Sequence, residues 1–359
     1  MFTSALAAVS GKSNSLNLPK REKYIVILVD GLGSHNLESA KGHARFLSSH
    51  NTRKISCWFP STTAASLVSL SLGLRPGQHP FIGYQVFDRE AGRVVNLLSG
   101  IGNSDGEILL GSNKTADQLA GLANVAFTFI GPAAYKSSGF TTAFLPAAEY
   151  VAAASIEERF SKAIDRLSSP GQEIIYLYVP ELDQIAHSKG WHHLSWAMQL
   201  ELLDSQVQNM ASRIGDKHGI VLTADHGVID VDYSQHIYLD EFFDKGEFAA
   251  VAGDTRALYL YQGDGSQDSI KADSLKTRLE HVLGNRAVVA TPKDLREAGY
   301  WSDFSDQAKI FEPHLIVIAT AKVALYHRDF AKPQSLKMIG HHGAASPEEL
   351  LVPLIVLGA

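Results

Sequence analysis

The chain has 359 residues, of which 45% are hydrophobic and 19% charged, and it contains 16 Phe, 12 Tyr and 4 Trp. This composition excludes a disordered or fibrous protein, and the length allows two or three compact units or one large α/β domain with insertions. The 32 basic and 38 acidic residues give a net charge of −6 without a long run of one sign, which disfavours a nucleic-acid polymer as a partner.

The N-terminal residues carry none of the signals that direct a chain to a membrane. Residues 2–9 are weakly apolar and have no Lys or Arg ahead of them, and no stretch reaches the roughly 18 uncharged apolar residues of a membrane span. The single cysteine, Cys57, forms no internal disulfide, which fits a reducing compartment. We therefore expect a cytoplasmic protein that does not bind a membrane.

Continuous apolar, β-branched runs predict strands of a sheet that is buried on both faces. These runs lie at 24–29, 173–179, 219–223, 315–320 and 351–357. Helical patterns alternate with them at 36–48, 62–72, 155–167 and 194–214. The last has an apolar stripe made of Leu194, Met198, Leu202, Val207 and Met210. The order predicts an α/β fold with a mostly parallel central sheet, helices on both faces, and ligands at the carboxyl ends of the strands.

The pattern changes between residues 233 and 311. A strand at 256–261 is followed by a helix at 268–283 and another strand at 286–290, which is typical of a small α+β unit. We therefore expect a catalytic core made of 1–232 and 312–359 and an inserted cap subdomain at 233–311. Residues 84–124, rich in Gly, Asn and Asp, are a further candidate for a loop-rich insertion.

Asp30 ends the first predicted strand and is followed by Gly31 and Gly33, which allow a sharp turn. The position of the third glycine of a dinucleotide fingerprint holds Asn36, so that interpretation is rejected. Taken alone, the motif is explained equally well by a helix N-cap and by a metal ligand.

The run Ser61-Thr62-Thr63 begins a predicted helix directly after Pro60. A hydroxyl at a helix N-terminus faces the positive end of the dipole, which suits a nucleophile that attacks a phosphate. Helix capping is nevertheless the commoner explanation of such a cluster on its own.

Three further motifs supply metal-ligand chemistry. Asp183 and His187 are four residues apart after a strand, Asp225 and His226 are adjacent at another strand end, and the pair His341-His342 precedes a glycine. A spacing of four places both side chains on one face of a helix. With Asp30 and a hydroxyl, this inventory is sufficient for two divalent metals.

In this order the motifs resemble the alkaline phosphatase superfamily, most closely its type I phosphodiesterase and nucleotide pyrophosphatase branch. The resemblance spans the chain from the Val-Asp-Gly at 29–31 to the Ser-Pro-Glu-Glu-Leu-Leu-Val-Pro at 346–353. It implies an alkaline phosphatase-like core with one metal on Asp183, His187 and His342. It implies a second metal on Asp30, Thr63, Asp225 and His226.

The resemblance also favours one residue in each of two neighbouring pairs. Thr63 is preferred to Thr62 because the Leu-Gly-Leu at 72–74 matches the Thr-Gly-Leu that follows the nucleophile in relatives. His342 is preferred to His341 because relatives carry His directly before Gly.

The implied mechanism is a two-step displacement through a phospho-threonine intermediate. It uses two divalent ions, with Zn²⁺ expected and Mn²⁺ as the alternative. The backbone N–H of Ala64 is placed to hold a phosphate oxygen, Ser66 stands where relatives carry an Asn, and Tyr84 is a candidate substrate contact.

The expected function is hydrolysis of phosphodiester or pyrophosphate bonds in a small phosphorylated, nucleotide-like substrate. A phosphomonoesterase or phosphonate hydrolase of the same superfamily is the alternative, because such enzymes use the same ligand set. A metal-binding scaffold without activity is the alternative from another class. A sulfatase is set aside, because Cys57 is followed by Trp-Phe-Pro rather than by the motif that is converted to formylglycine.

Overall fold

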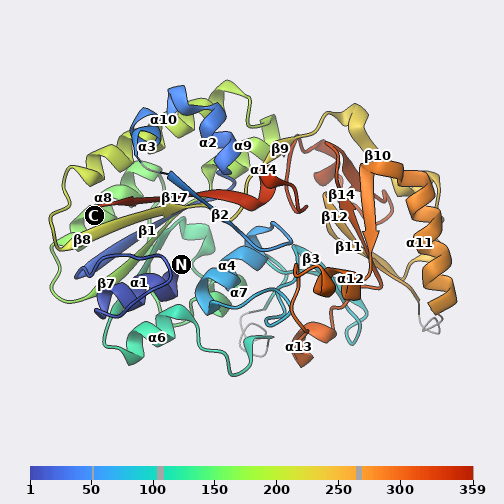
Figure 1. Cartoon of the computed structure of the whole chain (residues 1–359), viewed down its shortest axis with the longest axis horizontal. Coiled ribbons are helices and arrows are strands. Elements are labelled where there is room, and N and C mark those ends of the chain that lie inside the picture. Colours follow the sequence, from blue (N-terminus) through green and yellow to red (C-terminus); the bar gives the residue numbers. More distant parts are fainter. Residues whose placement is uncertain (51, 103–108, 264–268, 359) are drawn as a thin grey trace.

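The computed structural model describes residues 1–50, 52–102, 109–263 and 269–358, which form two sheets that lie side by side (Figure 1). The larger sheet has seven strands in the order β2-β17-β8-β1-β7-β5-β6. Strands β8, β1, β7, β5 and β6 are parallel to one another, whereas β17 runs antiparallel to both β8 and β2. The seven strands are β1 (Lys23–Val29), β2 (Thr52–Ser56), β5 (Ala126–Gly131), β6 (Glu149–Ala152), β7 (Glu173–Val179), β8 (His218–Thr223) and β17 (Leu351–Leu357).

Helices cover both faces of this sheet, as the sequence predicts (Figure 1). Alternate residues of β1 belong to two separate apolar cores: Val26 and Leu28 face one, and Ile25 and Ile27 face the other. The first core is covered by α1 (Phe2–Val9), α4 (Thr63–Leu72), α6 (Ala116–Leu122) and α7 (Gly139–Phe144). The second is covered by α2 (Ser34–Ser39), α3 (Arg45–Ser49), α8 (Ile156–Leu167), α9 (Glu181–Lys189) and α10 (Leu194–Ala211).

The predicted apolar stripe of α10 is wrong in part. Leu194 and Met198 are 68% and 59% exposed, whereas Val207 and Met210 are buried as expected. The buried side is completed by Trp196, Leu200 and Leu203, which have the 3.6-residue period of a helix face.

The smaller sheet is antiparallel and has six strands in the order β13-β14-β12-β11-β3-β4. Its strands are β3 (Gln85–Asp88), β4 (Arg93–Asn96), β11 (Ala250–Asp254), β12 (Ala257–Tyr261), β13 (Ala287–Ala290) and β14 (Leu315–Ala319). Helices α11 (Ser269–Leu283), α12 (Pro292–Glu297) and α13 (Asp306–Lys309) accompany it. The strand-helix-strand order predicted for 256–290 is therefore present.

The expectation that 315–320 is a strand of the parallel sheet is wrong, because β14 pairs antiparallel with β12 and β13. A run of five buried apolar residues fits any strand covered on both faces, so the pattern does not reveal to which sheet it belongs. The smaller sheet also takes β3 and β4 from the region expected to be a loop-rich insertion. The domain boundaries at 233 and 311 stay a prediction.

Two short strand pairs and a last helix complete the description. Strand β10 (His236–Tyr238) pairs with β15 (Ala324–Tyr326), and β9 (Ile229–Asp230) pairs with β16 (Gly340–His341). Helix α14 (Pro347–Leu350) precedes β17. Within the described ranges, no helix combines the length and the apolar character needed to cross a bilayer.

Candidate metal centre

Three buried carboxylates gather at the carboxyl ends of neighbouring strands. Asp30 directly follows β1, Asp183 lies in the first turn of α9 just after β7, and Asp225 follows β8. Because β8, β1 and β7 are adjacent and parallel, their carboxyl ends meet at one edge of the sheet. The fold thus brings together residues that are far apart in the sequence.

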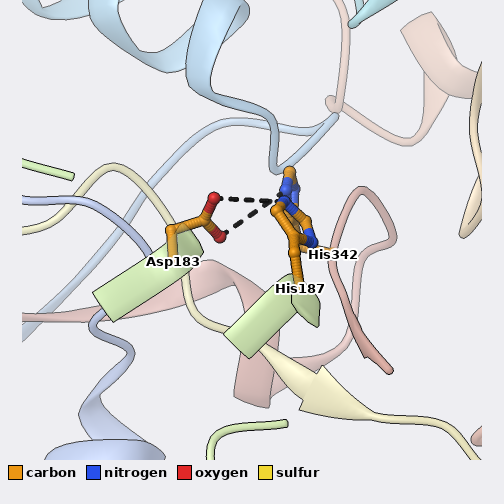
Figure 2. Close-up of side chains that lie close together, drawn as sticks. All are labelled: Asp183, His187 and His342. Carbon is orange, nitrogen blue, oxygen red and sulfur yellow. Dashed lines mark ion pairs between the residues drawn. The ribbon is translucent and has the colours of Figure 1, made fainter. Parts of the chain in front are cut away.

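Asp183, His187 and His342 form the first group of ligand atoms (Figure 2). The Nε2 atom of His187 lies 3.1 Å from Asp183 Oδ2, and His342 Nε2 lies 4.0 Å from Asp183 Oδ1. The three ligand atoms lie within 4.8 Å of one another, a spacing that fits a single metal ion.

A second group adjoins the first and consists of Asp30, Asp183 and His226. The Nε2 atom of His226 lies 3.4 Å from Asp30 Oδ1, 3.5 Å from Asp225 Oδ2 and 3.2 Å from the Thr63 hydroxyl. The ring of His226 also stacks on that of His342 with centroids 3.8 Å apart. The structure therefore brings all seven side chains predicted as metal ligands into one contiguous cluster.

The backbone orients each histidine of this cluster. Nδ1 of His187 lies 2.9 Å from Gly340 O, Nδ1 of His226 lies 3.2 Å from Gly227 O, and Nδ1 of His342 lies 2.8 Å from Ser61 O. A carbonyl oxygen only accepts hydrogen bonds, so each Nδ1 carries the proton and donates it. Nε2 is then the nitrogen available to a metal ion in every case, and the Nδ1 contact matches the outer hydrogen bond that metal-binding histidines typically make.

Each of the three carboxylates has one buried oxygen without a hydrogen-bond partner. Asp30 Oδ1, Asp183 Oδ1 and Asp225 Oδ2 are buried without a hydrogen bond, and no lysine or arginine in the described part of the chain pairs with them. Burial, together with the charges of Asp225 and Asp183, raises the pKa of Asp30 well above its usual value. Burial and Asp183 likewise raise the pKa of Asp225 to about 6. Divalent cations would supply the missing positive charge, so the residues fit a metal site.

His187 shows how proton and metal compete for this cluster. Burial works to lower the pKa of His187, but the adjacent Asp183 carboxylate outweighs it and raises the pKa to about 9. A cation that binds Nε2 must therefore displace this proton, so metal binding is coupled to proton release.

Thr63 is the first residue of α4 and its hydroxyl faces His226, whereas the buried hydroxyl of Thr62 makes no hydrogen bond. The preceding Ser61 accepts a hydrogen bond from Gly343 N at 3.0 Å and donates one to Ala344 O at 2.8 Å. The start of α4 is therefore fixed against the segment that carries His342. This geometry brings the hydroxyl of Thr63 to the cluster.

A buried ion pair holds the same segment from the other side. Glu349 receives hydrogen bonds from Arg256 Nη2 at 2.8 Å and from Ala344 N at 2.9 Å, and both charged side chains are almost fully buried. Because Arg256 lies between β11 and β12, this pair connects the smaller sheet to the segment that carries His342.

A cavity of about 730 Å³ opens beside the cluster and is lined by Asp30, Thr63, Asp183, His187 and His342. Tyr84 lines it, as predicted for a substrate contact, whereas Ala64 and Ser66 are buried in α4 and are not among its lining residues. The roles assigned to these three residues stay predictions.

Two residues that line the cavity were not predicted from the sequence. The hydroxyl of Tyr178 donates a hydrogen bond to Asp30 Oδ2, and Asp254 lies 4.0 Å from His342. Tyr176 and Tyr178 lie two positions apart in an otherwise apolar strand. Two hydroxyl groups in such a buried run are the sequence feature that could have indicated a site residue. Asp254 ends a strand of the smaller sheet, and no motif marks it.

The family model for type I phosphodiesterase / nucleotide pyrophosphatase matches residues 24–345, which is most of the chain. The chain belongs to this family. It is therefore a hydrolase of the phosphodiesterase and nucleotide pyrophosphatase type, and the family is metal-dependent. No curated protein matches the sequence.

Solved structures of ectonucleotide pyrophosphatase / phosphodiesterase 5 have the same fold. The human protein superposes with a TM-score of 0.73 at 16% identity and covers 93% of this chain and 87% of its own. The murine protein gives 0.72 at 15% identity, with 92% and 87% covered, and one of its structures is of an inactive variant in complex with AMP. The alkaline phosphatase-like α/β fold expected for this member of the phosphodiesterase family is thereby confirmed.

Proposed function

We propose that this phosphodiesterase-family protein cleaves phosphodiester or pyrophosphate bonds in small, nucleotide-like substrates, with Thr63 as the nucleophile. The observation that carries the proposal is the Thr63 hydroxyl, which lies 3.2 Å from His226 Nε2 and beside buried carboxylates that have oxygens without hydrogen-bond partners. The resident ions would be two divalent metals, Zn²⁺ or Mn²⁺, because the ligand atoms are imidazole nitrogens and carboxylate oxygens.

When bound, the two ions would lower the pKa of the Thr63 hydroxyl and neutralise charge on the phosphate. The side chain of Thr63 would then attack phosphorus in line with the leaving oxygen and form a phospho-threonine, which water hydrolyses in a second step. Backbone N–H groups in the first turn of α4, including that of Ala64, have no partner within the helix and suit a non-bridging phosphate oxygen.

The charge of the cavity supports a diester over a monoester. Apart from histidine, the only basic residue that lines it within the described part of the chain is Lys332, and no arginine there does. A monoester carries a dianionic phosphate, which favours additional cationic contacts such as a bidentate arginine. A small substrate also fits the cavity of about 730 Å³ better than a nucleic-acid polymer or a membrane surface.

The test compares wild type, Thr63→Ala and Thr62→Ala. Turnover is measured with bis-p-nitrophenyl phosphate, p-nitrophenyl phosphate and the p-nitrophenyl ester of thymidine monophosphate, and bound metal is measured by mass spectrometry. We expect wild type to prefer the diesters, and Thr63→Ala to lose at least about 1000-fold in kcat while it retains metal through the remaining ligands.

Thr62→Ala is the matched control, because it removes a neighbouring buried hydroxyl that makes no hydrogen bond. It should keep most of the wild-type turnover. Unchanged turnover in Thr63→Ala would reject the nucleophile, a preference for the monoester would indicate the phosphatase alternative, and metal binding without any turnover would indicate the scaffold.

A further inference from the structure

The second group of ligand atoms lies on segments that extend beyond the larger sheet. The pairing of β1 with β8 ends two residues before Asp30 and three residues before His226. Beyond it, Gly31 N donates a hydrogen bond to Asp225 Oδ1 at 3.2 Å. The 3.4 Å that separates His226 Nε2 from Asp30 Oδ1 therefore depends on contacts outside the β1–β8 pairing.

The side chain of Asn36 joins these two segments. Its Oδ1 accepts hydrogen bonds from Gly33 N at 3.1 Å and from Val228 N at 3.3 Å, and its Nδ2 donates one to Val228 O at 2.9 Å. Asn36 is fully buried and binds both backbone groups of Val228, as a neighbouring strand would. Gly33 follows Asp30 by three residues. Val228 follows His226 by two, so the amide connects the segments of both ligands.

Helix capping explains only part of this arrangement. Asn36 lies in the first turn of α2, and its bond with Gly33 N satisfies a donor at the start of that helix. The two bonds with Val228 lead to a segment 192 residues away in the chain and add nothing to α2. They indicate that the side chain also fixes one segment against the other.

The backbones that Asn36 joins are in close contact. A Cβ atom at Gly33 would lie 2.7 Å from Gly227 Cα, and one at Gly227 would lie 2.0 Å from Glu348 O. Neither position has room for a side chain, so no side chain there can repack to absorb a shift of the backbone. A displacement of the segment around Gly227 would therefore pass to the adjacent His226.

The first group of ligand atoms is fixed in another way. Asp183 and His187 lie four residues apart on α9, so the helix itself sets their spacing. His342 is oriented by its hydrogen bond with Ser61 O. In the described structure, the hydrogen bonds of the Asn36 side chain reach neither of these segments. Loss of this amide should therefore weaken one ion selectively.

We propose that Asn36 is a positioning residue for the second metal ion, because its side-chain amide sets the separation between Asp30 and His226. The proposal rests on the two-ion site proposed above. Asn36 acts through the two segments and touches neither an ion nor the substrate. The residue that distinguishes this motif from a dinucleotide fingerprint thereby gains a role of its own.

Two backgrounds that each keep one ion test this assignment. His187→Ala removes a ligand of the first group and leaves the second ion, whereas His226→Ala leaves the first. The Kd for Zn²⁺ is measured by competition with a chromogenic chelator. We expect Asn36→Ala to raise Kd by about 10-fold or more in the His187→Ala background, and by less than about 2-fold in the His226→Ala background.

Asn14→Ala is the matched control. The amide of Asn14 makes the same two-way pair with the backbone of Leu18, at 2.9 Å for each bond, in a segment that carries no ligand. This variant should leave Kd unchanged in both backgrounds. If Asn36→Ala does not fold, Asn36→Ser replaces it, because the serine hydroxyl and a water can together satisfy the freed backbone groups. It should show the same selective rise in Kd, smaller in size.

The outcomes separate the role of Asn36 from the site itself. An unchanged Kd in the His187→Ala background would overturn the proposal and leave the two-ion site intact. An equal rise in both backgrounds would also overturn it, because a general loss of structure weakens both ions alike. A wild-type protein that binds fewer than two ions would reject the two-ion site, and the role of Asn36 with it.

Discussion

At the scale of single residues, Glu173 shows how a buried acid is stabilised away from the metal centre. It receives hydrogen bonds from Thr128 Oγ1 at 2.7 Å, Arg166 Nε at 2.8 Å and Lys23 Nζ at 3.1 Å, and only 2% of its side chain is exposed. Burial works to raise its pKa, but these three donors outweigh burial and lower the pKa below 4.5. Glu173 contrasts with Asp30, which lacks a basic partner and has a raised pKa.

This network predicts an acid-sensitive contribution to stability. Because the pKa of Glu173 is lower in the folded state, its stabilising effect is fully present above the unfolded pKa of 4.5 and is lost as pH falls through the folded pKa. Glu173→Gln should lower the free energy of unfolding by about 2–4 kcal/mol at pH 7, because it leaves the buried Lys23 without its carboxylate partner and removes one of the two carboxylates that pair with Arg166. The difference from wild type should shrink below pH 4.5.

Urea denaturation at several pH values between 3 and 7 measures this difference. Glu149→Gln is the control, because Glu149 contacts the same Arg166 but is 59% exposed, so its loss should cost little. A difference between Glu173→Gln and wild type that stays constant with pH would contradict the assignment.

At the scale of elements, the turn between β1 and α2 determines where two ligands lie. Gly31 has a φ of +72°, and a Cβ atom there would lie 3.0 Å from both Cβ and Oδ1 of Asp183. Its N–H donates a hydrogen bond to Asp225 Oδ1 at 3.2 Å. Gly31 is therefore required for both its backbone conformation and the space beside it.

Gly31→Ala and Gly92→Ala separate these two requirements. Gly92 has a φ of +63°, but nothing lies within 4 Å of its Cβ position. Both variants should lose about 1–2 kcal/mol of stability from the left-handed conformation. Only Gly31→Ala should also bind less metal, measured by mass spectrometry, and lose activity, because it displaces Asp183. Equal metal content in the two variants would show that a Cβ atom at position 31 is accommodated without displacing Asp183.

The elements themselves were largely predictable from local pattern. The strands β1, β7 and β8 are continuous apolar runs with short polar segments after them, so both their existence and the ligand positions at their ends follow from the sequence. Strand β14 has the same pattern, but its pairing with β12 and β13 depends on contacts between distant segments. Periodicity therefore identified the strand but not its sheet.

At the scale of the whole molecule, the dependence on contacts between distant segments also explains why two residues of the site were not predicted from the sequence. The seven predicted ligands come from ordered motifs, and the structure places them in one cluster. Asp254 reaches the cavity only because the smaller sheet packs beside the larger one, and Tyr178 reaches Asp30 from within a buried strand. The order and spacing of sequence motifs predict neither position, because both depend on packing between elements.

The cluster also joins distant parts of the fold, so metal should stabilise the whole molecule. Asp30 follows β1, whereas His342 follows β16 on the segment that Arg256 connects to the smaller sheet. An ion that binds only the folded state adds about 2.7 kcal/mol when its free concentration is 100 times Kd. Removal of metal with a chelator should therefore lower Tm, and added Zn²⁺ should restore it.

Differential scanning calorimetry of three proteins measures this coupling. In wild type and in the distant variant Glu149→Gln, Tm should fall by the same amount when metal is removed and rise by the same amount when Zn²⁺ is added. In His342→Ala, which lacks a ligand that joins the two parts, Tm should change less. An identical Tm with and without metal in the wild type would mean that the unpaired carboxylates are tolerated without cations. Their burial without a lysine or arginine partner among the described residues makes that outcome physically costly, because like charges would then be held together in a low-dielectric interior.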